Sequence, residues 1–382
     1  MVQQSKKEYV EAIWGRYRRV GRQAKGRILD EFTKVCGYSR KYAIARLSRP
    51  LRSRKSKPGP ACRYGRDVLT VLRAIWLMTD QLCSKRLKHA LPIWLPWYEK
   101  DYGCLAASVR QDVLTISPAS IDRLLKPVRL RYGKRGRGGT KPGSLLKQQI
   151  PVRTHNWDIT KPGYLEADTV AHGGGSMEGN FVWSLTFTDI FSGWTENRAC
   201  WNRGAHAVLE QIKDVERHLA FNILGFDSDN GSEFLNHHLM RYLNQRPKAV
   251  GWTRSREYRK NDNAHVEQKN WTHVRQLLGY ERIAIPEAVA PINDLYAHWN
   301  DLQNFFMPAI KLKAKQRIGS KIKRSYHPVQ TPAQRLLECP DISAEQKQAL
   351  RKRRERLNPI ALKKEVERNL RSVWDVVRQG TS

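Results

Sequence analysis

The sequence has few acidic residues for its number of basic ones. Among 382 residues, 36 are Asp or Glu and 69 are Lys or Arg, so the formal net charge is +33. An enzyme that handles small metabolites rarely carries such an excess. A positive charge of this size concentrates polyanions around a protein, and nucleic acid is the most abundant polyanion in a cell. The composition therefore favours a nucleic-acid partner.

Long apolar runs and closely spaced cysteines are also missing. No apolar run reaches the roughly 18 residues of a membrane span, and residues 1–8 lack the apolar core of a signal peptide. The six cysteines lie at least 21 residues apart, which excludes a C-x-x-C zinc pair and the disulfide framework of a small secreted domain. We expect no membrane partner and a cytoplasmic protein with reduced thiols.

Several catalytic motifs are absent from the sequence. There is no H-E-x-x-H and no G-x-S-x-G. His172-Gly173-Gly174-Gly175 lacks the Gly-Lys-Ser/Thr ending of a phosphate-binding loop and is interpreted as a hairpin tip. His265-Val266-Glu267 has the H-x-E spacing of zinc deaminases, but the P-C-x-x-C that accompanies it is missing. Carboxylates remain as the candidate catalytic groups.

Charge is distributed unevenly along the chain. Residues 158–285 hold 15 basic and 16 acidic residues, whereas residues 1–66 hold 19 and 4, residues 67–157 hold 16 and 6, and residues 310–382 hold 19 and 7. A single charged run is usually only a solvated surface. A near-neutral block between basic flanks instead suggests flanks that hold DNA phosphates around a centre with another role.

Residues 1–66 are predicted to form a helix-turn-helix-like DNA-binding unit followed by a basic linker. Gly37 interrupts an apolar periodicity of helical spacing, and Ser39 can cap a new helix that starts near Arg40. In such units the second helix enters the major groove, so its basic side chains are candidate DNA contacts: Arg40, Lys41 and Arg46. An ordinary helical hairpin is the alternative.

Residues 67–132 are predicted to form a second helical DNA-binding unit, with helix over 67–100 and a further helix after Ser117-Pro118. Its candidate contacts are Arg123 and Lys126. Residues 133–157 follow as a glycine-rich cationic linker suited to a phosphate backbone or a minor groove, with candidate contacts at Lys134, Arg135 and Arg137.

Residues 158–309 have the pattern of a mixed α/β core. β-branched and aromatic residues predict strands at 164–170, 181–189, 194–201, 223–226 and 249–253. Helices are expected at 204–219, at 232–245 and after Asn261-Asp262-Asn263. Three strands followed by alternating helices and short strands predict a mixed five-stranded sheet flanked by helices. Residues 310–382 form a basic C-terminal region, with an extended segment at 325–332 and helix beyond Asp341, which we expect to contact DNA or another protomer.

Three carboxylates of this core share a feature: each lies where a strand or helix can direct it toward the others. Asp168 lies within a predicted central strand, Asp229 follows a second short strand, and Glu267 lies on a helix. An all-oxygen site of this kind suits Mg²⁺ or Mn²⁺. Two such ions can hold the attacking and leaving oxygens of a phosphodiester. Taken singly, each acid is equally explained by a salt bridge, a turn or a solvated surface.

The segments around these acids resemble the integrase-core motifs of bacterial insertion-sequence transposases, which retroviral integrases share. The matching strings are Ala167-Asp168-Thr169, Ser228-Asp229-Asn230-Gly231-Ser232-Glu233-Phe234 and the segment from Asn261 to Asn270. The resemblance covers about residues 150–285 and implies an RNase-H-like fold and a DDE recombinase whose metal ligands are Asp168, Asp229 and Glu267. It departs from the family in having Val274, followed by Arg275, where a basic residue is frequent.

The resemblance implies a DNA transposase that binds terminal inverted repeats, uses two Mg²⁺ or Mn²⁺ ions, cleaves the element end and joins it to target DNA. The implied partners are double-stranded DNA and further copies of the chain in a dimer or larger synaptic complex, with no nucleotide cofactor. Lys269 and Arg275 are further candidate DNA contacts. The alternatives are a domesticated regulator that binds DNA without cleaving it and a nuclease that cleaves without joining.

Overall fold

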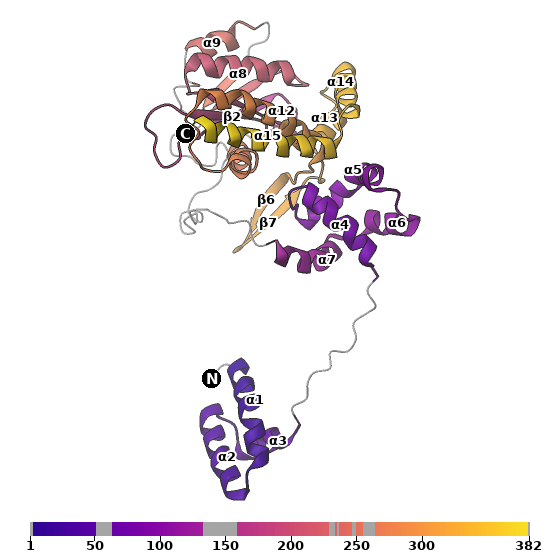
Figure 1. Cartoon of the computed structure of the whole chain (residues 1–382), viewed down its shortest axis with the longest axis vertical. Helices are drawn as coiled ribbons and strands as arrows, with labels where there is room; N and C mark the ends of the chain where they lie inside the picture. Colours follow the sequence, from indigo (N-terminus) through magenta and orange to yellow (C-terminus); the bar gives the residue numbers. More distant parts are fainter. Residues whose placement is uncertain are drawn as a thin grey trace. The chain divides into compact units, whose positions relative to one another are not determined.

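The computed structural model describes residues 3–50, 63–132, 159–228, 234, 237–246, 250–254 and 264–380. The chain divides into two compact units, Met1–Arg63 and Tyr64–Ser382 (Figure 1). Each unit has its own cluster of buried apolar residues. Within these described ranges, no helix combines the length and the apolarity that a bilayer crossing requires.

The first unit is a bundle of three helices, α1 (Gln3–Arg19), α2 (Arg22–Cys36) and α3 (Arg40–Ser48). Gly37 ends α2 with a left-handed conformation at φ 70°, which glycine adopts without a steric penalty. The Ser39 side chain caps α3 by accepting a hydrogen bond from the Tyr42 amide at 3.3 Å. The predicted break at Gly37 and cap at Ser39 are confirmed, and DNA binding by α3 stays a prediction.

The second unit begins with α4 (Arg66–Met78), α5 (Ser84–Tyr102), α6 (Ala107–Thr115) and α7 (Pro118–Arg131). The prediction of helix throughout 67–100 is wrong, because Asp80 and Gln81 both have positive φ, 50° and 62°, and separate α4 from α5. These helices share one apolar cluster with the sheet that follows. Trp94 Nε1 in α5 donates a 2.9 Å hydrogen bond to the Phe306 carbonyl, which ties the helices to the core.

A mixed sheet forms the centre of the second unit. Its strands are β1 (Tyr164–Ala171), β2 (Val182–Asp189), β3 (Thr195–Trp201), β4 (Gly225–Ser228) and β5 (Gly251–Arg254), in the order β3-β2-β1-β4-β5. β2 pairs antiparallel with both β1 and β3. β4 pairs parallel with β1 on one side and with β5 on the other. This arrangement fits an RNase-H-like core. The fourth strand lies two residues later than predicted and therefore includes Asp227.

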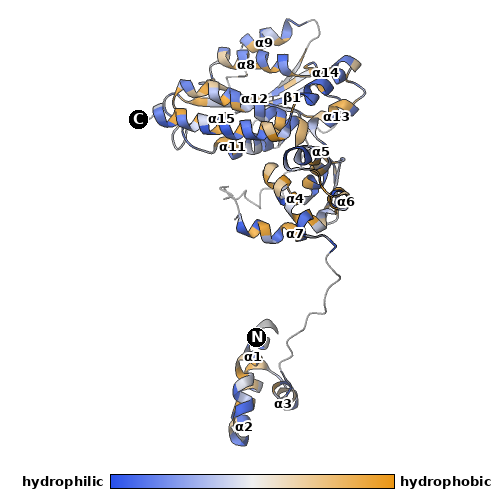
Figure 2. Ribbon diagram, turned by 45° about the vertical axis from the view of Figure 1, so that its right-hand side comes forward, coloured by the Kyte–Doolittle hydropathy of each residue, from blue (hydrophilic) through white to orange (hydrophobic). Residues whose placement is uncertain are grey.

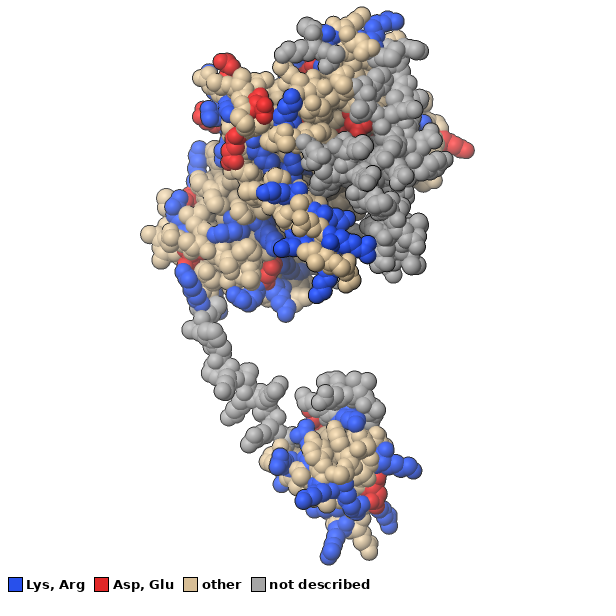
Figure 3. Space-filling model, turned by 180° about the vertical axis from the view of Figure 1, so that it is seen from behind, with Lys and Arg blue, Asp and Glu red and all other residues tan. Residues whose placement is uncertain are grey.

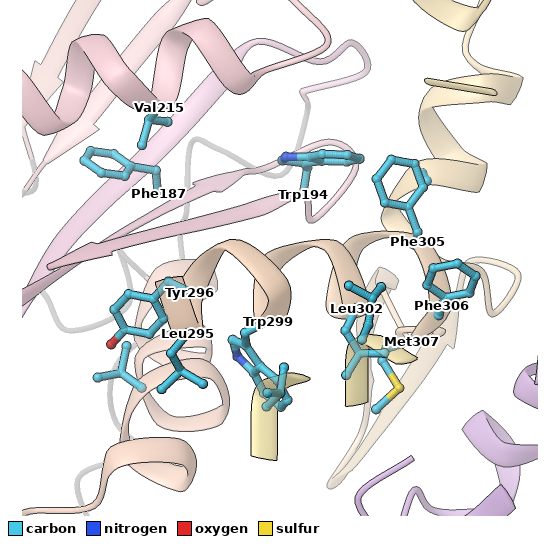
Figure 4. Packing of buried hydrophobic residues seen from close by; sticks show 14 of the residues in the cluster. Phe187, Trp194, Val215, Leu295, Tyr296, Trp299, Leu302, Phe305, Phe306 and Met307 are labelled. Atoms are coloured by element: carbon cyan, nitrogen blue, oxygen red, sulfur yellow. The ribbon is translucent and has the colours of Figure 1, made fainter. Parts of the chain in front are cut away.

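Helices cover both faces of this sheet. Phe187 of β2 meets Val215 of α8 (Ala205–His218) on one face, and α12 (Val289–Phe306) lies on the other (Figure 4). α9 (His237–Asn244) packs with α8, and α12 packs against α15 (Pro359–Gly380). α15 carries both hydrophilic and hydrophobic residues (Figure 2), and the hydrophobic residues Val366 and Val373 are buried.

The free edge of β3 is covered by asparagine side chains from α12. Asn304 accepts from the Thr195 amide at 2.9 Å and donates to the Thr195 carbonyl at 2.8 Å. Asn300 pairs in the same way with the amide and carbonyl of Asn197, and Asn293 with those of Ala199. An uncovered edge would leave these backbone groups open to pairing with another chain. α12 thus takes the place of a sixth strand.

The C-terminal region begins with a hairpin that sequence analysis missed, β6 (Leu312–Ile318) paired with β7 (Lys321–Tyr326). The segment predicted as extended, 325–332, therefore starts inside β7 and ends where Thr331 caps α13 (Pro332–Glu338). The prediction of helix beyond Asp341 is confirmed by α14 (Ala344–Glu355) and α15.

Replacing Asn300 by alanine tests the edge cover. Asn300 is 1% exposed and also donates to Glu196 Oε2 at 3.1 Å, so Asn300→Ala leaves several buried polar groups unsatisfied. We expect a loss of about 3 kcal/mol in unfolding free energy, measured by denaturant titration. The matched control on the same helix is the exposed Asp294→Ala, for which a change within about 0.5 kcal/mol is expected. Equal losses in the two variants contradict this role of Asn300.

Candidate active site

Asp168 lies on β1, the central strand of the sheet, where it is partly buried. Its Oδ1 accepts a hydrogen bond from the Thr169 amide at 2.8 Å. Its Oδ2 accepts one from Asn270 Nδ2 at 2.7 Å. The carboxylate is therefore held from two sides, once by its own strand and once by a helix 102 residues later in the chain.

That helix runs through α10 (Ala264–Lys269), the π-helix η3 (Asn270–Arg275) and α11 (Gln276–Leu278). Glu267 lies on α10, exposed to solvent and three residues before Asn270. Residues three apart lie on the same side of a helix. The bond from Asn270 to Asp168 therefore puts Glu267 on the side of the helix that meets β1. π-helical turns are rare and frequently occur at functional sites.

Glu166 holds the start of the same helix, and sequence analysis missed it. Its side chain is fully buried, and Oε2 accepts hydrogen bonds from the backbone amides of His265 and Val266, each at 3.0 Å. A carboxylate at a helix N-terminus satisfies unpaired amides and is favoured by the helix dipole. Glu166 and Asp168 are two residues apart and so point to the same face of β1. An acidic residue two positions before Asp168 was the sequence signal that could have identified Glu166.

β4 lies beside β1 in the sheet and pairs with it in parallel. The parallel register pairs Glu166 with Asp227 and Ala167 with Ser228. Asp227, at 9% exposed, lies inside β4. Asp229, the predicted second member of the acidic trio, falls outside the described residues.

The donors present around Asp168 fit a divalent cation. The Asp168 carboxylate offers hard oxygens, which Mg²⁺ and Mn²⁺ prefer. Asn270 donates to Asp168 through Nδ2, and its buried Oδ1 has no hydrogen-bond partner in the part of the chain that the structure describes. A cation or its water would satisfy such an amide oxygen. The same part of the chain contains no cluster of three or more His, Cys, Asp or Glu arranged as metal ligands.

Two predicted DNA contacts on this helix have partners or neighbours inside the protein. Arg275 donates to the Ala171 carbonyl at 2.9 Å and lies 4.6 Å from the centre of the Tyr280 ring, so it ties the helix to the end of β1. Lys269 lines a cavity that opens to the surface. Burial and the nearby charges of Arg86 and Arg335 lower the pKa of Lys269 to about 7. Their role in DNA binding stays a prediction.

The remaining candidate DNA contacts lie apart from the carboxylates in the sequence. Lys41 and Arg46 are exposed on α3, where Arg40 forms an ion pair with Asp30. On α7, Lys126 is exposed, and Arg123 donates to Ser120 Oγ at 2.9 Å. Three others fall outside the described residues: Lys134, Arg135 and Arg137.

Comparison with known proteins identifies a relative whose sequence matches most of this chain. No protein-family model matches. The uncharacterized protein y4rM of Sinorhizobium fredii (strain NBRC 101917 / NGR234) is 42% identical over 336 residues, which cover 86% of this chain and 94% of y4rM. The chain belongs to the y4rM family. Because the identity is 42% over 336 residues, this chain and y4rM share one fold.

Among solved structures, the chain is similar to retroviral integrase proteins. One is from the simian T-cell lymphotropic virus intasome in complex with PP2A regulatory subunit B56 gamma, at 14% identity and a TM-score of 0.28, covering 47% of this chain and 58% of that one. Another is the catalytic core domain of BIV integrase, at 16% identity and a TM-score of 0.27, covering 45% and 91%. Both superpositions are weak, so the fold assignment rests on strand order and register.

Substitution of Glu166 tests whether it positions the helix that carries Glu267. Glu166→Ala removes two hydrogen bonds to a charged acceptor, and we expect a loss of about 3 kcal/mol in unfolding free energy. Glu166→Gln keeps one acceptor oxygen, so its loss of unfolding free energy should be smaller. Hydrogen exchange of the His265 and Val266 amides measures the effect at the helix itself. Unchanged protection of these amides in Glu166→Ala contradicts the positioning role.

Proposed function

We propose that the chain is a DNA recombinase of the transposase type, which cuts at the ends of a mobile element and joins them to target DNA. One observation carries the proposal: Asn270 and Glu166 hold the Glu267 helix against the strand that bears Asp168. This attachment supports a site shared by two carboxylates from separate elements, Asp168 and Glu267. The sequence motifs add Asp229 as the third member.

The chemistry assigned to this site is the exchange of one phosphodiester for another. Divalent ions held by the acidic trio would lower the pKa of a water and neutralise charge on the phosphate. Asp168 and Glu267 would provide ligands, Asn270 fixes the direction of the Asp168 carboxylate, and Glu166 fixes the helix. Water would attack the phosphodiester at the element end and release the 3′-hydroxyl of the element. That hydroxyl would then attack a target phosphodiester and displace the 3′-oxygen of the target strand. Positioning and charge are the protein's contributions.

The hairpin of β6 and β7 supports DNA as the substrate. Its cations are exposed on both strands: Lys313, Lys315, Arg317, Lys321, Lys323 and Arg324. Lys315 lies directly opposite Arg324 in the antiparallel register, and like charges in that position destabilise a hairpin. Basic side chains gather over this part of the second unit (Figure 3). A polyanion relieves the repulsion, and a two-stranded ribbon fits the major groove.

The hairpin charges predict a specific change in salt dependence. Replacing both Lys315 and Arg324 by glutamine removes two phosphate contacts, so the slope of log K against log salt should fall in magnitude by about 2. Fluorescence anisotropy with a labelled duplex measures it. The matched control pair is Lys161→Gln with Arg203→Gln, both exposed in the near-neutral block and outside the candidate DNA contacts, and it should leave the slope unchanged. Equal slopes for the native chain and the hairpin variant contradict DNA contact by the hairpin.

A cleavage and strand-transfer assay tests the function. Labelled DNA that flanks the gene is incubated with the full chain and Mg²⁺ or Mn²⁺. We expect nicked and joined products from the native chain and at least a thousandfold fewer from Asp168→Asn or Glu267→Gln, with binding of the DNA retained. Glu210→Gln, an exposed acid on α8, is the matched control and should keep activity.

The other outcomes of this assay are equally definite. Specific binding without cleavage in either metal contradicts the proposal and favours a DNA-binding regulator. Nicking without joined products favours a nuclease. Loss of binding together with cleavage in Asp168→Asn contradicts the metal-ligand role of Asp168.

A further inference from the structure

A cavity of about 490 Å³ lies on the side of the Glu267 helix that is opposite to Asn270. The helix lines it with residues at successive turns, His265, Lys269 and His273. The other walls come from α5, α12, the start of β6 and α13. The cavity therefore adjoins the candidate active site through one helix but takes no part in the chemistry proposed there.

Four basic side chains line this cavity: Arg86, Lys269, Lys311 and Arg335. Three are anchored by carbonyl oxygens. Arg86 Nε donates to Pro308 at 2.6 Å, Arg335 Nη1 donates to Ser192 at 2.8 Å, and Lys311 donates to Phe191. Carbonyl anchors hold these groups in place without neutralising their charge.

Among the described residues, carboxylates near the cavity balance these charges only in part. Asp80 also lines the cavity, but it accepts an ion pair from Lys363 at 2.7 Å. Asp189, which lies near Lys311, accepts hydrogen bonds from Ser192 and from the Gly163 amide. Glu338, near Arg335, accepts from Gln330.

Buried nitrogen atoms at the cavity have no partners. Arg335 is 7% exposed, and its Nε makes no hydrogen bond within the described chain. His273 is 3% exposed, and its Nε2 is also without a partner among the described residues. Buried donors are normally satisfied, and each exception points to a missing partner. These atoms, together with four cations, call for an acceptor that carries negative charge.

We propose that this cavity binds a phosphate group, either free or at the 5′ end of a DNA strand. A phosphate carries close to two negative charges and several acceptor oxygens, which matches four cations better than a singly charged carboxylate does. Guanidinium groups held in fixed orientations suit such oxyanions. Occupancy would remove the repulsion around Lys269 and stiffen the helix that carries Glu267. The inference depends on the cavity and not on the proposed recombination.

Thermal unfolding of the full chain tests this site without metal or cleavage. The midpoint is measured in chloride and in inorganic phosphate at matched ionic strength, and again with a trinucleotide that does or does not carry a 5′-phosphate. A ligand that binds only the folded state raises the midpoint. We expect phosphate to raise it, and Lys269→Gln to weaken the apparent affinity about tenfold or more.

Two controls make the result decisive. Lys352→Gln on α14 loses the same charge from an exposed position and should respond like the native chain. Lys269→Gln should be at least as stable as the native chain in chloride, because it removes a repelled cation. A response to the phosphorylated trinucleotide alone, weakened in Lys269→Gln, identifies the strand end as the ligand. The proposal is overturned if no phosphate compound raises the midpoint, or if Lys269→Gln responds like the native chain.

Discussion

The contact between the buried Glu166 carboxylate and the first amides of α10 is the constraint on which the candidate site depends. A charged group that is fully buried is tolerated only where hydrogen bonds satisfy it. Here the amides of His265 and Val266 donate to Oε2, each at 3.0 Å. Together with the bond from Asn270 to Asp168, this contact fixes both the entry and the direction of the helix. The position of Glu267 follows from these two attachments.

The same helix separates two kinds of electrostatic environment. Glu267 and Asn270 lie on the side that meets β1, whereas His265, Lys269 and His273 line the cationic cavity. Burial and nearby Lys and Arg charges lower the pKa of His265 to about 4 and that of His273 well below its usual value, so both are neutral near pH 7. One helix thus carries Asn270, which bonds to Asp168 on the sheet, and three nitrogen-bearing side chains that line the cavity. The asparagines of α12 hold the edge strand of the sheet on which this helix rests.

Sequence patterns predicted the strands of the sheet, Asp168 within the first of them and Glu267 on a later helix, because alternation and helical spacing are local signals. They missed Glu166, whose role depends on a contact with amides 99 residues away. They also missed the β6–β7 hairpin, which has no buried face and so no apolar alternation. The helix predicted over 67–100 is broken at Asp80 and Gln81 by backbone conformations that apolar periodicity does not reveal.

Binding of Mn²⁺ tests most directly whether the attachments of this helix assemble a metal site. Titration calorimetry of the full chain, without DNA, compares the native protein with Asp168→Asn, Glu267→Gln and the exposed Glu210→Gln. The account predicts saturable binding to the native chain and to Glu210→Gln, and at least tenfold weaker binding to both other variants. Equal affinity in all four proteins, or binding that Glu267→Gln leaves unchanged, would contradict a site shared between β1 and α10.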